Sequence, residues 1–346
     1  MTDINTPRLA DWLRENVEDF RGALRITTLT GGQSNPTYRI DADTHRWVLR
    51  RKPPGALLAS AHAVDREFRV LQALQRSDVP VPRVHALCTD ETVIGSMFYI
   101  MDFVEGRTFI DPSLPGMDPS ERLAIYQELQ RVLAAIHSVD IHKAGLTDFG
   151  RPGNYLARQR DRWANQYRTS QTETISAMDN LIDWLHANPP PEGDTTLVHG
   201  DFRLDNVLFH PTEPRALAVI DWELSTLGNP EVDLAYHAMA WHLSPEEFRG
   251  LRGHNLTSLG IPSEAEQLVG WSRLSGRSVP NDWVYYLVFN MFRLACILQG
   301  ILARAKQGNA ASDDAETTGQ RARLIAQAGW SLASARIDGA GGESSV

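Results

Sequence analysis

The sequence has little cysteine and no surplus of positive charge. Cys88 and Cys296 are the two cysteines in 346 residues, and with no C-x-x-C spacing they indicate neither a disulfide framework nor a zinc site. Lys and Arg number 34 against 43 Asp and Glu, and the net charge of −9 disfavours a general affinity for nucleic acid. The start, MTDINTPRLADWLREN, lacks the apolar core of a signal peptide, so we expect a cytoplasmic protein.

The chain has one long apolar run, Trp283 to Ala305, which raises the question of a membrane span. Arg293 lies in the middle of this run, with Asn290 and Gln299 nearby, and such side chains are costly in lipid. We therefore expect a buried helix of a globular protein and no membrane insertion. The length suits about two domains, each able to bury its own core.

The most informative stretch follows Leu197. His199-Gly200-Asp201 is followed five positions later by Asn206, and an apolar run then ends at Asp221. Phosphoryl transfer needs one carboxylate beside the attacking hydroxyl, and an amide and a second carboxylate to hold Mg²⁺ on the phosphates. A tight loop can present Asp201 and Asn206 to one cavity, and a hairpin return brings Asp221 back beside them.

Two segments, HGDFRLDNVLFH and IDWELSTLGNPEVDLAY, resemble the aminoglycoside phosphotransferase family of kinase-like enzymes, whose pattern is H-G-D-x-x-x-x-N and then I-D-W/F. They are more similar still to kinase domains fused to, or encoded near, certain acyl-CoA dehydrogenases. The catalytic loop of protein kinases has the same spacing between base and amide. The resemblance implies that Asp201 is the catalytic base and that Asn206 and Asp221 are ligands of Mg²⁺.

The resemblance also implies an α+β, two-lobed protein-kinase-like fold. A small antiparallel-sheet lobe at 1–101 would bind the nucleotide, and 102–106 would be a hinge whose Asp102 and Val104 backbone groups contact adenine. A larger, mainly helical lobe at 107–338 would carry the catalytic loop and the acceptor site, and 339–346 would be a flexible tail.

In the small lobe, β-type runs at 24–29 and 37–40 are joined by a turn that contains glycine. In kinases a Gly-rich hairpin tip covers the nucleotide phosphates, because backbone N–H groups can approach them only where side chains are small. We therefore predict phosphate contacts from four residues of this turn: Gly31, Gly32, Gln33 and Ser34.

The next strand, RWVLRRK, lies where a kinase carries its phosphate-binding lysine. Alternation puts Val48, Arg50 and Lys52 on one face, where Val48 would line the adenine pocket. Arg50 is favoured over Lys52 as the phosphate contact, because the dehydrogenase-associated domains tend to carry V-L-R here. On the following helix, Glu67 falls where a kinase has the glutamate that pairs with the strand cation.

Helical periodicity predicts the main helices of the larger lobe, at 119–141, 155–168, 174–187 and 315–335. Asp148-Phe149-Gly150 spells the kinase metal motif, but it precedes the catalytic loop, so we expect an ordinary loop there. Arg158 and Arg162 would share a helix face, which suits either an anionic acceptor or a solvated surface.

Further residues around the catalytic loop have open roles. Arg203 could steady the transferring phosphoryl group and Asp205 could approach a metal, or each could tether the loop. Asp233 matches the aspartate that, in the family, braces the catalytic loop through backbone hydrogen bonds. We expect His199 to fix the loop rather than to titrate in catalysis.

The function predicted is that of a small-molecule kinase, which transfers the γ-phosphoryl group of ATP to a hydroxyl. The resemblance implies a hydroxyacyl-CoA or hydroxy acid as acceptor; an aminoglycoside is the weaker alternative, because this polycation needs an acidic pocket. A nucleotide-binding pseudokinase would normally lose the base or a metal ligand, and all three are present. A protein kinase would need more than the twelve positions that separate Asp221 from Asp233.

Overall fold

The computed structural model describes residues 4–29, 35–43, 45–53, 63–151, 153–308 and 314–342. The predicted phosphate-binding turn, Gly31 to Ser34, lies outside the described residues. The chain forms two compact units, neither of them continuous in sequence: Met1–Thr108 with Asp140–Phe149 and Asn206–Ser225, and Phe109–Val139 with Gly150–Asp205 and Thr226–Val346. The hinge at 102–106 stays a prediction.

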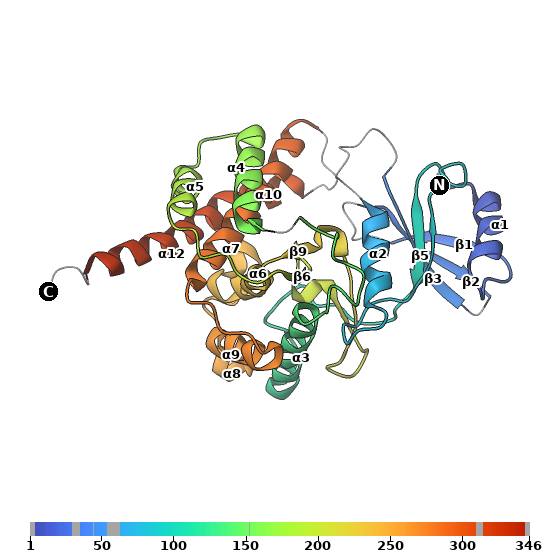
Figure 1. Cartoon of the computed structure of the whole chain (residues 1–346), viewed down its shortest axis with the longest axis horizontal. Coiled ribbons are helices and arrows are strands. Elements are labelled where there is room, and N and C mark those ends of the chain that lie inside the picture. Colours follow the sequence, from blue (N-terminus) through green and yellow to red (C-terminus); the bar gives the residue numbers. More distant parts are fainter. Residues whose placement is uncertain are drawn as a thin grey trace. The chain divides into compact units, whose positions relative to one another are not determined.

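The first unit contains a five-stranded antiparallel sheet in the order β1-β2-β3-β5-β4. Its strands are β1 (Arg25–Thr28), β2 (Thr37–Ala42), β3 (His45–Arg51), β4 (Val84–Cys88) and β5 (Phe98–Asp102). Helices α1 (Thr6–Asn16) and α2 (Val64–Leu74) lie on opposite faces of this sheet (Figure 1).

Helix α1 buries an apolar stripe, including Leu9 and Leu13, against Trp47 and Ile100 of the sheet. The helical period of the sequence continues to Phe20, but α1 ends at Asn16, because Val17 adopts an extended backbone. Phe20 is nevertheless fully buried in the same core. Apolar residues at helical spacing therefore stay buried beyond the end of the helix itself.

A second, smaller sheet of the first unit is a hairpin of β7 (Val207–Phe209) and β8 (Ala216–Val219). A 3₁₀ turn, η1 (Leu204–Asn206), precedes the hairpin and another, η2 (Trp222–Leu224), follows it. The indole of Trp222 donates to Val219 O (3.0 Å) and is almost completely buried. These contacts fix the backbone on both sides of Asp221.

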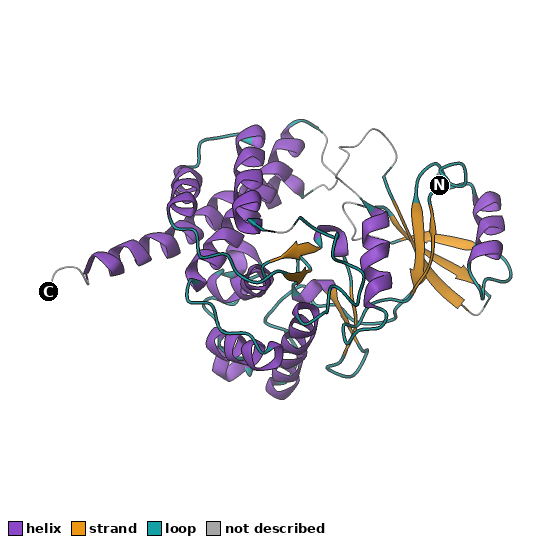
Figure 2. Ribbon diagram, in the orientation of Figure 1, coloured by secondary structure: helices purple, strands orange, loops and turns teal. Residues whose placement is uncertain are grey.

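The second unit is mainly helical (Figure 2). Its helices are α3 (Pro119–His137), α4 (Tyr155–Ser170), α5 (Ser176–Ala187), α6 (Pro230–His242), α7 (Pro245–Phe248), α8 (Leu256–Leu259), α9 (Glu264–Ser275), α10 (Trp283–Lys306), α11 (Ala315–Gln320) and α12 (Ala322–Gly342). Two short strands, β6 (Thr196–Val198) and β9 (Thr226–Gly228), pair antiparallel and flank the segment from Asp201 to Asp221 in sequence.

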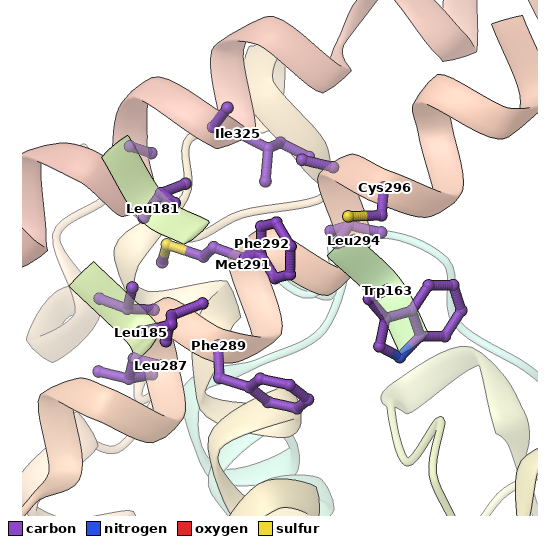
Figure 3. Packing of buried hydrophobic residues seen from close by; sticks show 14 of the residues in the cluster. Trp163, Leu181, Leu185, Leu287, Phe289, Met291, Phe292, Leu294, Cys296 and Ile325 are labelled. Carbon is purple, nitrogen blue, oxygen red and sulfur yellow. The ribbon is translucent and has the colours of Figure 1, made fainter. Parts of the chain in front are cut away.

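Helix α10 is the centre of this unit. It is long and apolar enough to cross a membrane by length and composition, but 89% of its most apolar window is buried within the protein. Figure 3 shows its side chains packed with Trp163 of α4, Leu181 of α5 and Ile325 of α12. The amide of Asn290 donates to Val232 O (2.8 Å), so this polar residue is satisfied inside the core. The predicted buried helix is confirmed.

The predicted helices at 155–168 and 174–187 each differ from α4 and α5 by two residues at one end, and two other predicted helices differ by more. Helix α3 stops at His137 rather than residue 141, because Ser138 begins a turn and its hydroxyl donates to Ala134 O (2.7 Å). The predicted helix at 315–335 is two helices. A side chain at Gly319 would bring its Cβ within 2.6 Å of Leu302 Cβ, so α11 lies unusually close to α10 before the break. Helix α12 then extends to Gly342, so residues 339–342 of the predicted tail continue the helix.

Truncation of a core side chain on α10 tests the importance of this packing. Phe292 is fully buried, and Phe292→Ala is expected to lower the free energy of unfolding by about 3–5 kcal/mol through lost burial and a cavity. Leu324→Ala on α12, where the side chain is 40% exposed, should cost less than about 1 kcal/mol. Urea denaturation of both variants measures the difference, and equal losses would contradict a core centred on α10.

Candidate active site

A buried arginine joins three elements of the first unit. Arg50 lies on β3, and its side chain is 9% exposed. Its Nε lies 2.9 Å from Glu67 Oε2 on α2, and its terminal nitrogen donates to Asp221 Oδ1 at 2.7 Å. Glu223 Oε2 lies 3.6 Å from the same nitrogen. The predicted pairing of Arg50 with Glu67 is present, and Asp221 shares the same guanidinium.

The β7–β8 hairpin brings the two predicted metal ligands of this unit next to each other. Val207 pairs with Val219, and the N–H of Ile220 donates to Asn206 O at 2.9 Å. Asp221 follows in the left-handed region (φ 66°, ψ 57°), which is uncommon outside glycine but tolerated by aspartate. This turn of the backbone directs the carboxylate toward Arg50.

Arg50, Glu67 and Asp221 border a cavity of about 400 Å³ within the first unit, and Asn206 is absent from its described lining. This is the size of a typical small-molecule pocket. Apolar side chains from several strands line one part of it: Leu29, Val48, Met101, Leu208 and Val219. Arg50, Glu67 and Asp221 line another part. The cavity therefore combines an apolar portion with a charged one, as a nucleotide requires.

Four residues that the sequence predicts at the nucleotide site line this cavity: Val48, Arg50, Asp102 and Val104. Lys52 is absent from its described lining. The N–H of Asp102 already donates to Arg83 O (2.8 Å), and its carboxylate lies 2.6 Å from His85 Nε2. Asp102 would therefore meet adenine through its carbonyl rather than its N–H.

Three carboxylates surround the single guanidinium of Arg50. Burial raises the pKa of the Glu67 carboxyl to about 7, and the charges of Asp221 and Glu223 act in the same direction against the opposing effect of Arg50. Burial alone would lower the pKa of Arg50, but the neighbouring carboxylates hold it above its usual value. The cluster thus has more negative than positive charge.

This surplus fits a divalent cation, and the ligand types fit Mg²⁺ in particular. Mg²⁺ in phosphoryl-transfer sites is usually held by one or two protein ligands together with the phosphates. Across the part of the chain that the structure describes, no three His, Cys, Asp or Glu side chains converge into a metal site of their own. A carboxylate and an amide on one hairpin are therefore a suitable donor set for a nucleotide-bound Mg²⁺.

In the second unit, a buried carboxylate holds the loop that carries Asp201. Asp233 Oδ2 accepts the N–H of His199 at 2.5 Å, and Oδ1 accepts the N–H of Gly200 at 2.8 Å. Gly200 has φ +85°, a conformation that favours glycine. The N–H of Asp201 donates to His199 Nδ1 (3.2 Å), so His199 fixes the loop from inside.

Asp233 is itself held by residues that the sequence did not indicate. His137 Nε2 of α3 lies 3.5 Å from Asp233 Oδ2, and the indole of Trp271 on α9 donates to His137 Nδ1 at 3.0 Å. Because Nδ1 accepts, the proton of a neutral His137 is on Nε2, facing Asp233. Burial lowers the pKa of His137. Burial would raise the pKa of Asp233, but its hydrogen bonds hold it below the usual value.

Two arginines and an aspartate flank Asp201 in this unit. Arg203 Nε lies 3.6 Å from Asp201 Oδ1 and 3.2 Å from Asp205 Oδ1. Arg249 donates to the other carboxylate oxygen of Asp205. Asp205 therefore tethers two cations within the second unit. Asp201 belongs to this unit and Asn206 and Asp221 to the other, so the convergence of all three residues stays a prediction.

A small cavity of about 60 Å³ opens beside Arg203 and Arg249. Asp205, which pairs with both arginines, also lines it. The rest of its wall is largely aromatic and aliphatic and includes Tyr126, Tyr236, Met239, Trp241, Leu243 and Phe248. The sequence did not predict this cavity, because its wall comes from α3, α6 and α7, which share no motif.

Asp148 and Arg158, two further residues that the sequence analysis considered, both contact neighbouring loops or helices. Asp148 lies in a loop and pairs with Arg69 (3.2 Å to its Oδ2), as expected of a residue outside the active site. The guanidinium of Arg158 donates to Arg151 O (2.7 Å) and to Gly153 O, so it closes the preceding loop. These contacts favour a structural role for Arg158.

The raised pKa of Glu67 predicts a specific pH dependence of stability. A carboxyl group with a raised pKa stabilises the fold fully below its unfolded value of about 4.5, and this contribution is lost as the pH rises through about 7. The free energy of unfolding should therefore fall between pH 5 and 8 by on the order of 1–3 kcal/mol more in wild type than in Glu67→Gln. Denaturation at several pH values tests this, and parallel curves would refute it.

The anchor at Asp233 should be important for stability. Asp233→Asn places an amide against the N–H groups of His199 and Gly200, and should cost roughly 3 kcal/mol or more in free energy of unfolding. Asp194→Asn is the control, because its ion pair with Arg277 leaves the carboxylate 76% exposed and should contribute less than about 1 kcal/mol. A loss for Asp233→Asn no larger than that of the control would argue against the anchor.

Comparison with known proteins agrees with this geometry. The chain is 45% identical over 315 residues to acyl-CoA dehydrogenase family member 10 of Mus musculus, covering 90% of this chain and 29% of the relative. It is 39% identical to acyl-CoA dehydrogenase family member 11 of Homo sapiens, covering 94% of this chain and 42% of the relative. The chain thus spans less than half the length of these relatives.

Solved structures show the same fold. A crystal structure described as that of a candidate aminoglycoside phosphotransferase from Ralstonia eutropha JMP134 is 50% identical, with a TM-score of 0.88 over 95% of this chain and 98% of that one. A mutant of aminoglycoside phosphotransferase APH(4)-Ia, in complex with AMP-PNP and hygromycin B, has a TM-score of 0.60 at 21% identity over 93% and 98% of the chains. The predicted kinase-like α+β fold is confirmed.

The sequence model of the phosphotransferase enzyme family matches residues 25–267. This match covers most of the chain and includes both the Arg50 cluster and the loop of Asp201. The chain belongs to this family.

Proposed function

We propose that this protein is a small-molecule kinase that transfers the γ-phosphoryl group of ATP to a hydroxyl group. The observation that carries the proposal is the position of Arg50, held between Glu67 and Asp221 at the charged part of a nucleotide-sized cavity. A cation paired with a helix glutamate, beside a metal-binding carboxylate, is the arrangement that kinases use to hold nucleotide phosphates.

The nucleotide would bind in the cavity of the first unit. Val48, Met101 and Leu208 offer an apolar surface for adenine, and the backbone of Asp102 and Val104 lies at the edge of the same cavity. Arg50 would contact the phosphates, because a guanidinium can bind carboxylates and a phosphate at the same time through its five N–H groups.

Mg²⁺ would be held by Asn206 and Asp221. When bound, it supplies positive charge that neutralises the phosphates during transfer. The residues themselves provide the fit, because they are neighbours on one hairpin and the three carboxylates around Arg50 leave an excess of negative charge.

Asp201 would act as the general base. It would accept the proton of the acceptor hydroxyl while the acceptor oxygen forms a bond to the γ-phosphorus and the bond to the β-phosphate oxygen breaks, which releases ADP. Arg203, 3.6 Å from Asp201, is placed to stabilise charge near the same carboxylate.

We infer that the acceptor is a hydroxyacyl-CoA or a hydroxy acid. The small cavity beside Arg203 and Arg249 is apolar along most of its wall, which suits an apolar chain, and its charged end holds these two arginines with Asp205 between them. The relatives named as acyl-CoA dehydrogenase family members support an acyl compound. An aminoglycoside is polycationic and is the weaker candidate beside two arginines.

The test is Mg²⁺-dependent release of ADP with a panel of hydroxyacyl-CoAs, free hydroxy acids and aminoglycosides. We expect an acyl compound to stimulate turnover, and Asp201→Asn to reduce kcat by roughly 10² to 10⁴-fold, the usual contribution of a general base.

Asp148→Asn is the matched control, because Asp148 lies in the Asp-Phe-Gly sequence yet pairs with Arg69. It should keep wild-type turnover. Full activity of Asp201→Asn, or equal losses in the two variants, would show that Asp201 is not the base. Stimulation by aminoglycosides alone would overturn the acyl acceptor while leaving the kinase activity in place.

A further inference from the structure

Arg249 has a backbone conformation that arginine seldom adopts. It directly follows α7, and its φ of 42° and ψ of 49° lie in the left-handed region. A residue with a side chain is strained there, because its Cβ approaches the neighbouring backbone too closely. Such strain persists only where the surrounding structure holds the residue in place.

Hydrogen bonds on both sides of Arg249 hold it in this conformation. Before it, the N–H of Ser244 donates to Glu247 Oε2 (2.8 Å) and the N–H of Glu247 donates to Ser244 Oγ (3.3 Å), so that α7 is closed by a capping box. After it, the N–H groups of Leu251 and Arg252 donate to carbonyls at the C-terminal end of α6 (2.6 and 2.9 Å). The segment from Ser244 to Arg252 is therefore tied to α6 on either side of the strained residue.

The guanidinium of Arg249 lies at the 60 Å³ cavity. One of its terminal nitrogens donates to Asp205, and its central carbon lies 5.6 Å from the centre of the Phe248 ring, which belongs to the same wall. Asp205 is the one hydrogen-bond partner of this guanidinium among the described residues, and the Arg249 side chain is 37% exposed. Most of its N–H groups can therefore reach a ligand.

The charges at this end of the cavity distinguish Arg249 from Arg203. Arg203 lies near two carboxylates, 3.6 Å from Asp201 and 3.2 Å from Asp205. Arg249 has a share in the carboxylate of Asp205 alone. Arg249 is thus the less neutralised of the two cations, and its planar fork suits carboxylate or phosphate oxygens.

We propose that Arg249 is a specificity-determining residue for the acceptor: it binds an anionic group of the acceptor, a carboxylate or a phosphate, at the charged end of the apolar cavity. The segment from Ser244 to Arg252 fixes the position of the guanidinium. A glycine would avoid the strain, so the arginine has a cost in stability that its side chain must justify. The proposal rests on the proposed kinase function, because it takes the small cavity as the acceptor site.

The binding test uses calorimetry without ATP and three probes: β-hydroxybutyrate, its coenzyme A thioester and its neutral methyl ester. In Arg249→Gln, we expect Kd to rise about 10- to 100-fold for at least one anionic probe and to stay unchanged for the ester. A rise for the hydroxy acid identifies the carboxylate, and a rise for the thioester alone identifies the phosphates. Equal changes for charged and neutral probes, or no binding of either anion to the wild type, would overturn the proposal.

The matched control is Arg252→Gln, which removes a cation from the same segment. Arg252 pairs with Glu247 (2.6 Å), has a side chain that is 51% exposed and is absent from the described lining of the cavity. It should leave the affinity for all three probes unchanged. An equal loss in the two variants would show a general effect of charge and would overturn the assignment to Arg249.

Kinetics separate this proposal from the kinase function. With an anionic acceptor, Arg249→Gln should raise KM about 10- to 100-fold and leave kcat unchanged, because it removes binding that is equal in the ground state and the transition state. An active wild type with an unchanged KM in the variant would reject the proposal and keep the kinase. An inactive wild type whose anion binding depends on Arg249 would reject the kinase and keep the anion site.

Thermal unfolding tests the strained backbone. Arg249→Gly and Arg249→Ala both remove the guanidinium, but glycine tolerates a φ of 42°, so Tm should be about 2–4 °C higher in Arg249→Gly. At Arg273, an exposed residue within α9, the order should be reversed, because a helix favours alanine. A lower Tm in Arg249→Gly than in Arg249→Ala would overturn the fixed, left-handed position of Arg249.

Discussion

The first unit depends on the burial of one positive charge. A guanidinium out of water is costly unless carboxylates surround it, and Arg50 is satisfied by Glu67 and Asp221, with Glu223 nearby. These residues come from a strand, a helix and the end of a hairpin. The ion cluster therefore restricts where three elements can lie, and it does so at the charged part of the cavity. The ion cluster that the fold needs to neutralise Arg50 therefore lies at the predicted nucleotide site.

In the second unit a buried negative charge, instead of a positive one, restricts where separate segments can lie. Asp233 is a buried carboxylate that accepts hydrogen bonds from two backbone N–H groups, with His137 Nε2 3.5 Å away. Three residues after Asp233 on α6 is Tyr236, whose ring centre lies 5.1 Å from the guanidinium carbon of Arg293 on α10. Helix α6 thus holds the loop of Asp201 through the carboxylate of Asp233. The position of α6 is in turn fixed by α10, through Asn290 and Arg293.

Local motifs in the sequence predicted much of this arrangement, and long-range partners were missed. The spacing of Asp201, Asn206 and Asp221 and the alternation along β3 are local, so the hairpin and the face of Arg50 followed from them. His137 and Trp271 lie on helices far from the catalytic loop in sequence, and each has an ordinary local pattern. Their pairing depends on how α3 and α9 pack, which periodicity does not encode.

The use of arginine rather than lysine at position 50 has a physical consequence. The Nε of Arg50 contacts Glu67 and a terminal nitrogen contacts Asp221, two groups on different edges of one rigid plane. A lysine ammonium is a point charge on a flexible stem and cannot fix two carboxylates in a defined relative geometry. With arginine, the orientation of α2 is coupled directly to the carboxylate of Asp221. The surplus negative charge of this cluster favours the entry of a cation, so the binding of a metal ion would relieve a repulsion among carboxylates that the fold itself maintains.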